Sequence, residues 1–106
     1  MVKFVVVLYR RPDLTPDAFF RNLRDEHGPL AEQLPGLRRY IQNHVVPDPK
    51  REHPGWDAVV EFYWDDRDWM EAAWAAPEGL AATAHLETLA DPARTTWSVV
   101  EEHVRL

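Results

Sequence analysis

The sequence predicts a single α+β domain in which a four-stranded antiparallel sheet carries helices on one face. Four segments are dense in β-branched and aromatic residues, which is typical of strands, and two segments between them place apolar residues at helical spacing. Proline, glycine and aspartate mark the junctions between these segments. The 106 residues, 45% hydrophobic and 28% charged, suit one soluble globular domain that spans residues 1–106.

The N-terminal part predicts a strand followed by a helix. Residues 2–10, VKFVVVLYR, are typical of a largely buried strand that ends at a turn. Thr15 followed by proline indicates a helix start, because threonine caps free N–H groups and proline suits the first turn. Apolar side chains then recur at helical spacing as far as Leu34. We expect this helix to be interrupted at Gly28 and Pro29.

The rest of the chain predicts three more strands and a second helix in two pieces. Strands are expected over residues 37–46, 56–64 and 97–105, and the charged, Pro-rich segment 47–55 is expected to connect two of them at the surface. A helix that begins after Asp65 and Asp66 is expected to break at Pro77 and to resume as far as Leu89.

The resulting order, β-α-β-β-α-β, is the ferredoxin-like arrangement, in which both helices lie on one face of the sheet. Tyr40, Gln42 and His44 share one face of their strand, because alternate residues of a strand point the same way. We expect this polar, aromatic face to lie on the side of the sheet that the helices leave open. Exposed apolar and aromatic surface of that extent usually marks an interface. Two sheets paired face to face would close a dimeric barrel around a cavity, so we expect a homodimer.

Composition and charge exclude several classes of function. Twelve basic and eighteen acidic residues give a formal charge of −6 without a run of Lys or Arg, so we expect no nucleic acid or membrane partner. The chain has no cysteine, which excludes disulfides and Cys-ligated metals and fits a cytoplasmic location. We expect neither a signal peptide nor a membrane span. No histidine spacing typical of a metal site and no glycine-rich nucleotide loop occurs, so we expect neither a metal nor an organic cofactor.

The sequence His27-Gly28-Pro29 stands inside the first helical pattern. Proline has no N–H, and its ring clashes with the carbonyl four residues earlier, so the helix is expected to kink or restart there. A restart would place His27 beside a helix N-terminus, whose positive dipole end favours a neutral imidazole. His27 is then either a kink residue whose ring packs under the helix or a general acid/base, because its ordinary pKa lies near neutrality.

The segment FFRNLRDEHGPLAEQLPGLRRYIQN, residues 19–43, resembles the signature of the EthD family of dimeric α+β barrels. The shared features are an aromatic residue, His-Gly-Pro, Leu-Pro-Gly and a tyrosine in the next strand. Residues 56–66 and 89–104 are similar to the family's third strand and closing segment. The resemblance implies a ferredoxin-like protomer that dimerises through its sheet around a small-molecule pocket, often without metal or organic cofactor. Members are associated with ether degradation, methylmuconolactone isomerisation and tailoring of aromatic polyketides.

The resemblance also implies roles for particular residues. The isomerases of the family use a histidine in the position of His27 and a tyrosine in that of Tyr40, which implies that these two residues are catalytic. A loop histidine of the isomerases has His53 as its counterpart, which implies a further substrate contact. From the residues alone, Tyr40 and His44, with Gln42 between them, either converge on a ligand or form a polar seam of the dimer.

Three further side chains are candidate substrate contacts. Asp57 and Glu61 lie four positions apart on one strand and so share a face. Inside a closed barrel a carboxylate has a raised pKa and can act as a base, whereas a carboxylate beside a basic side chain is only paired. Trp64 is either part of the core or an aromatic platform for the substrate.

The leading hypothesis is an enzyme that uses His27 and Tyr40 for proton transfer on a small cyclic or aromatic substrate, without a cofactor. The outcome would be isomerisation, cyclisation or oxidation. An alternative is a noncatalytic binding or accessory protein, in which the same pocket only holds a ligand. A third hypothesis is a dimer whose barrel is packed shut by tryptophan side chains.

Overall fold

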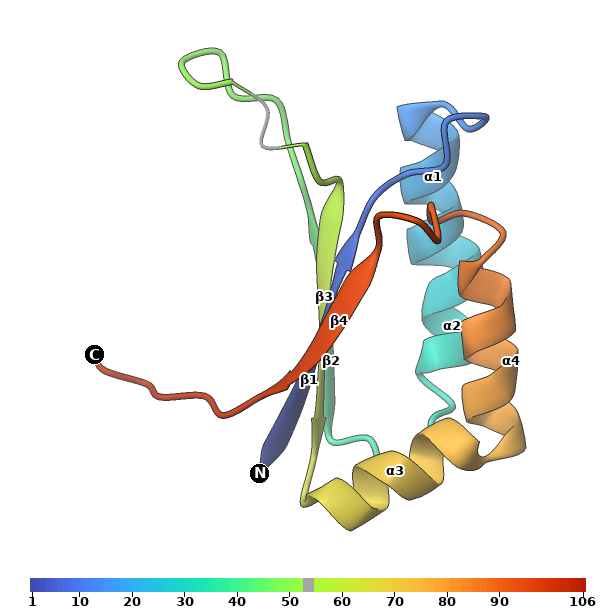
Figure 1. The fold of residues 1–106 in the computed structure, drawn as a ribbon, viewed down its shortest axis with the longest axis vertical. Coiled ribbons are helices and arrows are strands. Elements are labelled where there is room, and N and C mark those ends of the chain that lie inside the picture. The colour runs from blue at the N-terminus through green and yellow to red at the C-terminus, as the bar shows by residue number, and fades with distance from the viewer. Residues whose placement is uncertain (53–54) are drawn as a thin grey trace.

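The computed structural model describes residues 1–52 and 55–106 and has two layers, a sheet and a layer of helices that covers one of its faces (Figure 1). Within the described residues, the strands are β1 (Val2–Leu8), β2 (Arg39–His44), β3 (Ala58–Trp64) and β4 (Thr96–Val100). The helical segments are α1 (Pro16–Asn22), the π-helical η1 (Leu23–His27), α2 (Gly28–Ala31), α3 (Arg67–Ala75) and α4 (Pro77–Leu86). Neighbouring strands are antiparallel in the order β2-β3-β1-β4. The predicted ferredoxin-like order and the division of the second helix at Pro77 are confirmed.

Short polar side chains start two of the helices where the sequence predicts a start. Thr15 Oγ1 accepts a hydrogen bond from the N–H of Ala18 at 3.2 Å, and Asp66 Oδ1 accepts one from the N–H of Trp69 at 2.9 Å. Each bond satisfies one of the N–H groups that the first turn of a helix leaves unpaired. The local sequence therefore places these two helix starts.

The C-terminal segment leaves the sheet earlier than predicted. The expected strand over residues 97–105 is wrong beyond Val100, because residues 101–106 have no regular structure and extend on the side of the sheet opposite the helices (Figure 1). The carboxylate of Glu102 accepts hydrogen bonds from Lys3 Nζ at 2.7 Å and from Tyr63 Oη at 2.8 Å. These contacts hold the chain over the open face of the sheet instead of along its edge.

The register decides which side chains face the helices. Tyr40 lies opposite Phe62, and Gln42 lies opposite Val60. Residues directly opposite each other in an antiparallel pair point to the same face, and Phe62 and Val60 are buried under the helices. Tyr40, Gln42 and His44 therefore face the helices, and the expectation that they project from the open face is wrong.

The open face carries aliphatic side chains beside charged and polar ones. Ile41, between Tyr40 and Gln42, points to this face, together with Val5, Val7 and Val59 of the neighbouring strands. All four aliphatic side chains are half-buried in the protomer. Alternation in a sequence shows which residues share a face, but it does not show which face the helices cover, and here the face of β2 that holds Tyr40, Gln42 and His44 is covered.

The core lies between the sheet and the helices. Its largest fully buried side chains are Trp64, Phe19, Leu8, Leu23, Met70 and Leu89. Trp64 donates its indole N–H to the carbonyl of Pro35 at 2.9 Å, so of its two predicted roles the structure places it in the core. Gly36 makes the predicted turn after the first helix with φ +72°, where a Cβ would also lie 2.8 Å from Trp69 Cε3.

Candidate functional site

The backbone of residues 16–31 remains helical through the His-Gly-Pro sequence. The predicted kink or restart is replaced by one wide turn, η1, in which the N–H of Gly28 donates to the carbonyl of Leu23, five residues earlier. The backbone angles of His27 (φ −75°, ψ −40°) and Gly28 (φ −50°, ψ −52°) are helical. Pro29 explains the wide turn, because it has no N–H to donate to the carbonyl four residues before it. Such single π turns are frequent at functional sites.

Strand β2 supports the wide turn from the sheet. Gln42 Nε2 donates to the carbonyl of Leu23 at 2.8 Å and to Tyr40 Oη at 2.7 Å. The amide oxygen of Gln42 can only accept, so His44 donates to it through Nε2 at 2.8 Å. The ring of His44 also stacks on Phe20 of α1, with 5.1 Å between the ring centroids. The three predicted pocket residues of β2 thus form a ladder that holds η1.

Close packing and burial act on the side chains of Tyr40, Gln42 and His44. A Cβ on Gly28 would lie 3.3 Å from Gln42 Nε2, so glycine lets β2 approach the wide turn closely. Burial raises the pKa of Tyr40 and lowers the pKa of His44. Both shifts favour the neutral form of these side chains, as expected of polar groups that serve as hydrogen-bond partners in a structural contact.

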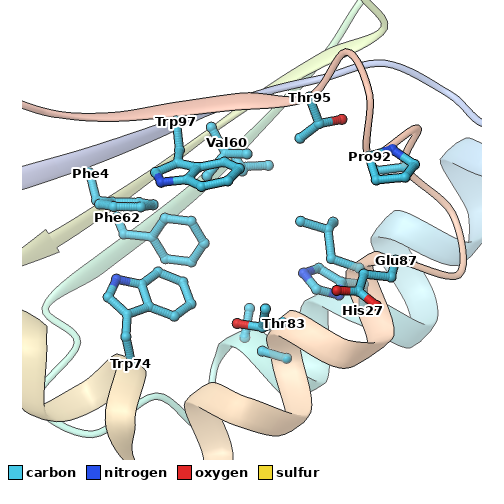
Figure 2. A pocket seen from close by; sticks show the side chains of 15 residues that line it. Phe4, His27, Val60, Phe62, Trp74, Thr83, Glu87, Pro92, Thr95 and Trp97 are labelled. Atoms are coloured by element: carbon cyan, nitrogen blue, oxygen red, sulfur yellow. The ribbon is translucent and has the colours of Figure 1, made fainter.

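A cavity of about 330 Å³ lies between the helices and the sheet (Figure 2). Its wall is mainly apolar, with Phe4, Phe62, Trp74 and Trp97 gathered on one side and His27 on the other. Trp97 belongs to the edge strand β4 and is 65% exposed, so it stands at the mouth of the cavity. An apolar cavity of this volume with few polar groups is typical of a small-molecule site.

His27 is the buried titratable group of the cavity wall. It is 4% exposed, and its ring packs nearly parallel to that of His85 from α4, with 5.3 Å between the centroids. The two Nδ1 atoms are 3.1 Å apart, so one donates a hydrogen bond and the other accepts it. Burial, and to a smaller extent the charge of His85, lowers the pKa of His27 from 6.5 to about 4. His27 is therefore neutral near neutral pH, as predicted, but because it is buried rather than because it lies at a helix end.

Sequence reasoning missed His85. It lies in the last turn of α4, 58 positions from His27, and nothing in the local spacing of either histidine indicates the other. Only the packing of α4 against η1 brings the two rings together. On its other side, His85 Nε2 lies 4.0 Å from Glu26 Oε2.

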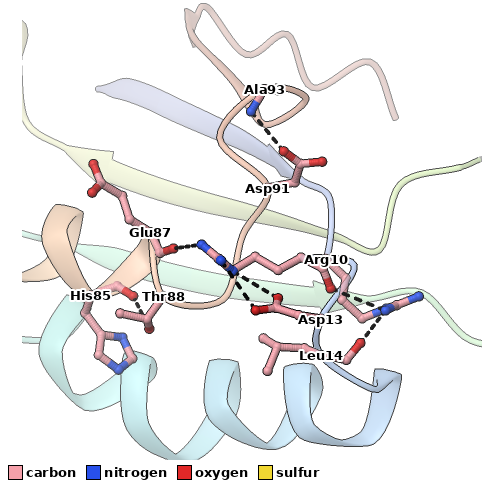
Figure 3. Close-up of polar contacts among 9 residues, drawn as sticks. Arg10, Asp13, Leu14, His85, Glu87, Thr88, Asp91 and Ala93 are labelled. Atoms are coloured by element: carbon pink, nitrogen blue, oxygen red, sulfur yellow. Dashed lines mark hydrogen bonds and ion pairs between the residues drawn. The ribbon is translucent and has the colours of Figure 1, made fainter.

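Polar contacts hold the C-terminal end of α4, which carries His85 (Figure 3). Arg11 Nη1 donates to the carbonyl of Glu87 at 3.1 Å, and Arg11 Nε pairs with Asp13 Oδ1 at 3.1 Å. Thr88 Oγ1 donates to the carbonyl of His85 at 2.6 Å. The backbone that carries His85 and Glu87 is thus held by the loop after β1 and by its own next turn.

The strand-three carboxylates do not join the histidines. Asp57 Oδ2 accepts a hydrogen bond from the N–H of Arg10 at 2.7 Å, beyond the end of β1. Glu61 lies on the open face, where it forms an ion pair with Lys3 and accepts a hydrogen bond from Asn43 Nδ2 at 2.8 Å. The contact with Lys3 is the main reason that the pKa of Glu61 is lowered. Each carboxylate therefore has its own partner, and neither lines the cavity.

Of the predicted site residues that the structure describes, His27 alone lines the cavity. The others are placed as follows: Tyr40, Gln42 and His44 under η1, Asp57 beside β1, Glu61 on the open face, and Trp64 in the core. His53 lies outside the described residues. These side chains do not surround one space within the protomer, because β2 and β3 distribute them over both faces of the sheet.

The described residues offer little for a metal ion. Across residues 1–52 and 55–106, no group of three or more His, Asp or Glu side chains is placed to hold one. The pair of His27 and His85 has a carboxylate nearby, that of Glu26, whose side chain is 65% exposed and whose Oε2 lies 4.0 Å from His85 Nε2. In the same part of the chain, no helix has the length and apolar character needed to cross a membrane.

Fold and cavity together define a ferredoxin-like α+β protein with a space of small-molecule size between its sheet and its helices. The EthD domain matches residues 11–93, which is most of the chain. The chain therefore belongs to the EthD family, and the resemblance of residues 19–43 to that family is confirmed.

Three of the solved structures that share this fold are informative. An EthD family protein from Bacillus halodurans has a TM-score of 0.81 and 27% identity, over 97% of this chain and 100% of that chain. A dimeric protein of unknown function with a ferredoxin-like fold, from Bacteroides fragilis, has a TM-score of 0.70 and 16% identity, over 95% of each chain. SnoaB, a cofactor-independent oxygenase from Streptomyces nogalater, has a TM-score of 0.65 and 21% identity, over 99% of this chain and 95% of that chain. The last two structures share the fold of this chain, and the likeness shows no more than that.

Proposed function

We propose that the chain is a small-molecule enzyme that carries out acid–base chemistry without an organic cofactor, with His27 as the proton acceptor. The supporting observation is a neutral imidazole in the wall of an apolar cavity, whose Nε2 has no partner among the described residues. Such a group can take a proton from an acidic C–H or O–H of a bound substrate. SnoaB, which has this fold, is described as a cofactor-independent oxygenase, and the proposed function likewise uses no cofactor.

The cavity favours a small cyclic or aromatic substrate. Phe62, Trp74 and Trp97 offer ring faces on which a planar molecule can stack, and the volume of about 330 Å³ limits its size. Removal of a proton leaves a carbanion or phenolate in the substrate. Return of the proton to another atom gives isomerisation or cyclisation, and reaction with dioxygen as the co-reactant gives oxidation.

The position of Tyr40 favours a supporting role in this function. Its hydroxyl accepts a hydrogen bond from Gln42, and its ring packs on Phe62 with 5.0 Å between the centroids, behind the cavity wall. We therefore assign Tyr40, Gln42 and His44 to holding η1, and with it His27, in place. The catalytic role that the family resemblance implies for Tyr40 stays a prediction.

The alternative is a noncatalytic ligand-binding or accessory protein of a catabolic or secondary-metabolite pathway. One observation favours it: within the described wall of the cavity, the titratable side chains are His27 and the exposed Glu87, so acid–base groups are sparse. The third hypothesis, a barrel packed shut by tryptophans, stays a prediction, because the cavity lies on the helix side of the sheet and not between two paired sheets.

The base-promoted ring opening of 5-nitrobenzisoxazole tests the proposal. A base removes the ring C–H proton and the N–O bond breaks, so a coloured cyanophenolate forms without any cofactor. We expect saturable catalysis near neutral pH that falls at least about 10-fold in His27→Gln. His103→Gln is the matched control, because that histidine lies in the exposed C-terminal segment.

Binding is measured in parallel by quenching of tryptophan fluorescence, since Trp74 and Trp97 line the cavity. Saturable binding without product would favour the accessory protein over the enzyme. Equal rates in the wild type and in a folded His27→Gln variant would contradict the assignment of His27 as the base.

We further propose that the chain forms a homodimer through the open face of its sheet. Val5, Val7, Ile41 and Val59 are half-buried there, and the protein from Bacteroides fragilis with this fold is described as dimeric. Sedimentation equilibrium of the wild type and of Val59→Lys tests it. A dimer that becomes a folded monomer in Val59→Lys supports the proposal, and a wild-type monomer at micromolar concentration contradicts it.

A further inference from the structure

Three side chains connect the surface of the helical layer with the cavity. Glu26 is exposed, His85 is half-buried and His27 is buried. Glu26 Oε2 lies 4.0 Å from His85 Nε2, and His85 Nδ1 lies 3.1 Å from His27 Nδ1. A ring nitrogen of His27 points into the cavity, as Figure 2 shows. Because Nδ1 is engaged with His85, the nitrogen available to a ligand is Nε2.

Electrostatics orders the hydrogens along this row. If His85 donated through Nδ1, a neutral ring would turn the Nε2 lone pair toward the negative carboxylate of Glu26. The opposite arrangement turns the Nε2–H of His85 toward that carboxylate and leaves its Nδ1 as the acceptor. His27 then donates through Nδ1–H, and its Nε2 carries a lone pair.

We propose that His85 is the positioning residue of the His27 base: by accepting the Nδ1–H of His27, it holds His27 in the tautomer that presents a lone pair to the cavity. This inference rests on the proposed function, in which that lone pair takes the substrate proton. A neutral histidine without a fixed partner exists as two tautomers. Without His85, only a fraction of the protein molecules would therefore turn an Nε2 lone pair toward the cavity.

The same contact is kept after the proton transfer. When His27 Nε2 takes a proton from the substrate, the ring carries one positive charge and its Nδ1–H still donates to Nδ1 of His85. In an isomerisation His27 returns the Nε2 proton to another atom of the substrate, so no proton is gained or lost.

Side-chain ¹H–¹⁵N correlation spectra near neutral pH test the tautomer without any substrate. The two neutral tautomers of a histidine have different ¹⁵N shifts, and the signals of His27 are those missing from His27→Gln. We expect the Nδ1–H tautomer for His27 in the wild type. We expect both tautomers in Glu26→Gln, where the carboxylate that orients His85 is gone. A wild-type His27 with its hydrogen on Nε2 would overturn the inference.

Two variants of His85 separate positioning from packing. Asparagine in His85→Asn keeps an acceptor oxygen near the place of Nδ1, whereas leucine in His85→Leu fills the space without an acceptor. With 5-nitrobenzisoxazole, we expect kcat to fall at least about 10-fold in His85→Leu with KM within about 3-fold, and to stay within about 3-fold of the wild type in His85→Asn.

The outcomes distinguish this inference from the proposed function. Equal kcat in the wild type and in a folded His85→Leu variant would overturn the positioning role while His27→Gln could still abolish turnover. Turnover that survives in His27→Gln would overturn the proposed function, whereas the tautomer of His27 is measured independently of turnover.

Discussion

The two faces of the sheet have opposite effects on the charge of ionisable side chains. On the face covered by helices, burial lowers the pKa of His27 to about 4 and raises the pKa of Tyr40. On the open face, a hydrogen bond to Glu102 raises the pKa of Lys3, and the contact with Lys3 lowers the pKa of Glu61. Loss of solvent therefore keeps the covered groups neutral, and pairing keeps the open-face groups charged.

This difference separates the place for chemistry from the place for association. A neutral imidazole in an apolar wall is available to accept a proton, which a charged one is not. On the open face, Lys3, Glu61 and Glu102 already satisfy one another within the protomer. The aliphatic side chains around them remain available to be buried by a second copy.

Truncation of the core should produce the largest effect. Trp64 is fully buried, packs on Phe62 and Trp74 and hydrogen-bonds Pro35, so we expect Trp64→Ala to lower the free energy of unfolding by about 3–5 kcal/mol. Val59→Ala on the half-buried open face should cost about 1 kcal/mol. Urea unfolding of both variants at low protein concentration makes the measurement. Equal losses would contradict the difference between the faces.

The pH dependence of stability tests the neutral state of His27. The unfolded chain binds a proton near pH 6.5, and the folded chain binds it only near pH 4. The contribution of neutral His27 to the free energy of unfolding is therefore full above about pH 6.5. It decreases by about 3 kcal/mol as the pH falls toward 4, because each unit of pKa difference corresponds to about 1.4 kcal/mol. We expect His27→Gln to flatten urea-unfolding free energies in this window and His103→Gln to leave the slope unchanged. A slope that persists in His27→Gln would mean that another group titrates.

Removal of the open-face cation should have a smaller effect. Lys3→Met leaves Glu61 and Glu102 without their cation, and we expect a loss of about 1–3 kcal/mol near neutral pH. Because the pKa of each carboxyl is lowered below 4.5, their contribution is lost as the pH falls, so the variant and the wild type should converge in acid. Lys50→Met, in an exposed loop, is the control for charge alone. A gap that stays constant in acid would point to packing instead.

The smallest effect is expected for Tyr40→Phe, which removes the hydroxyl bonded by Gln42. We expect a loss of about 1 kcal/mol in urea unfolding and a kcat for 5-nitrobenzisoxazole within about 3-fold of the wild type. A much larger fall in kcat with stability kept would make Tyr40 a catalytic residue, as the family resemblance implies.

The elements that were predicted well depend on short stretches of chain. Thr15 and Asp66 cap helices through bonds to residues three positions on, and Pro77 separates α3 from α4. The end of β4 was predicted less well, because Glu102 is drawn over the open face by Lys3, 99 positions away. Local pattern does not contain that contact.

The candidate site divides in the same way. His27 was singled out because the His-Gly-Pro sequence disturbs a helical pattern, and it lines the cavity. The sheet face toward which Gln42 and His44 point was predicted wrongly. Gln42 bonds the backbone of η1 and the ring of His44, so both side chains lie under the helices instead of facing the open side. His85 was not anticipated, because an isolated histidine near a helix end carries no local signal.

By itself, the sequence determined the order of strands and helices, the disturbance at Pro29 and membership of the EthD family. These features depend on residue types at fixed spacings along the chain. The tertiary structure decided which sheet face is covered, that the chain passes Pro29 in one wide turn, and that His85 meets His27 across 58 positions. The protonation state of His27 follows from that packing, because burial and neighbouring charge exist only once the helices lie on the sheet.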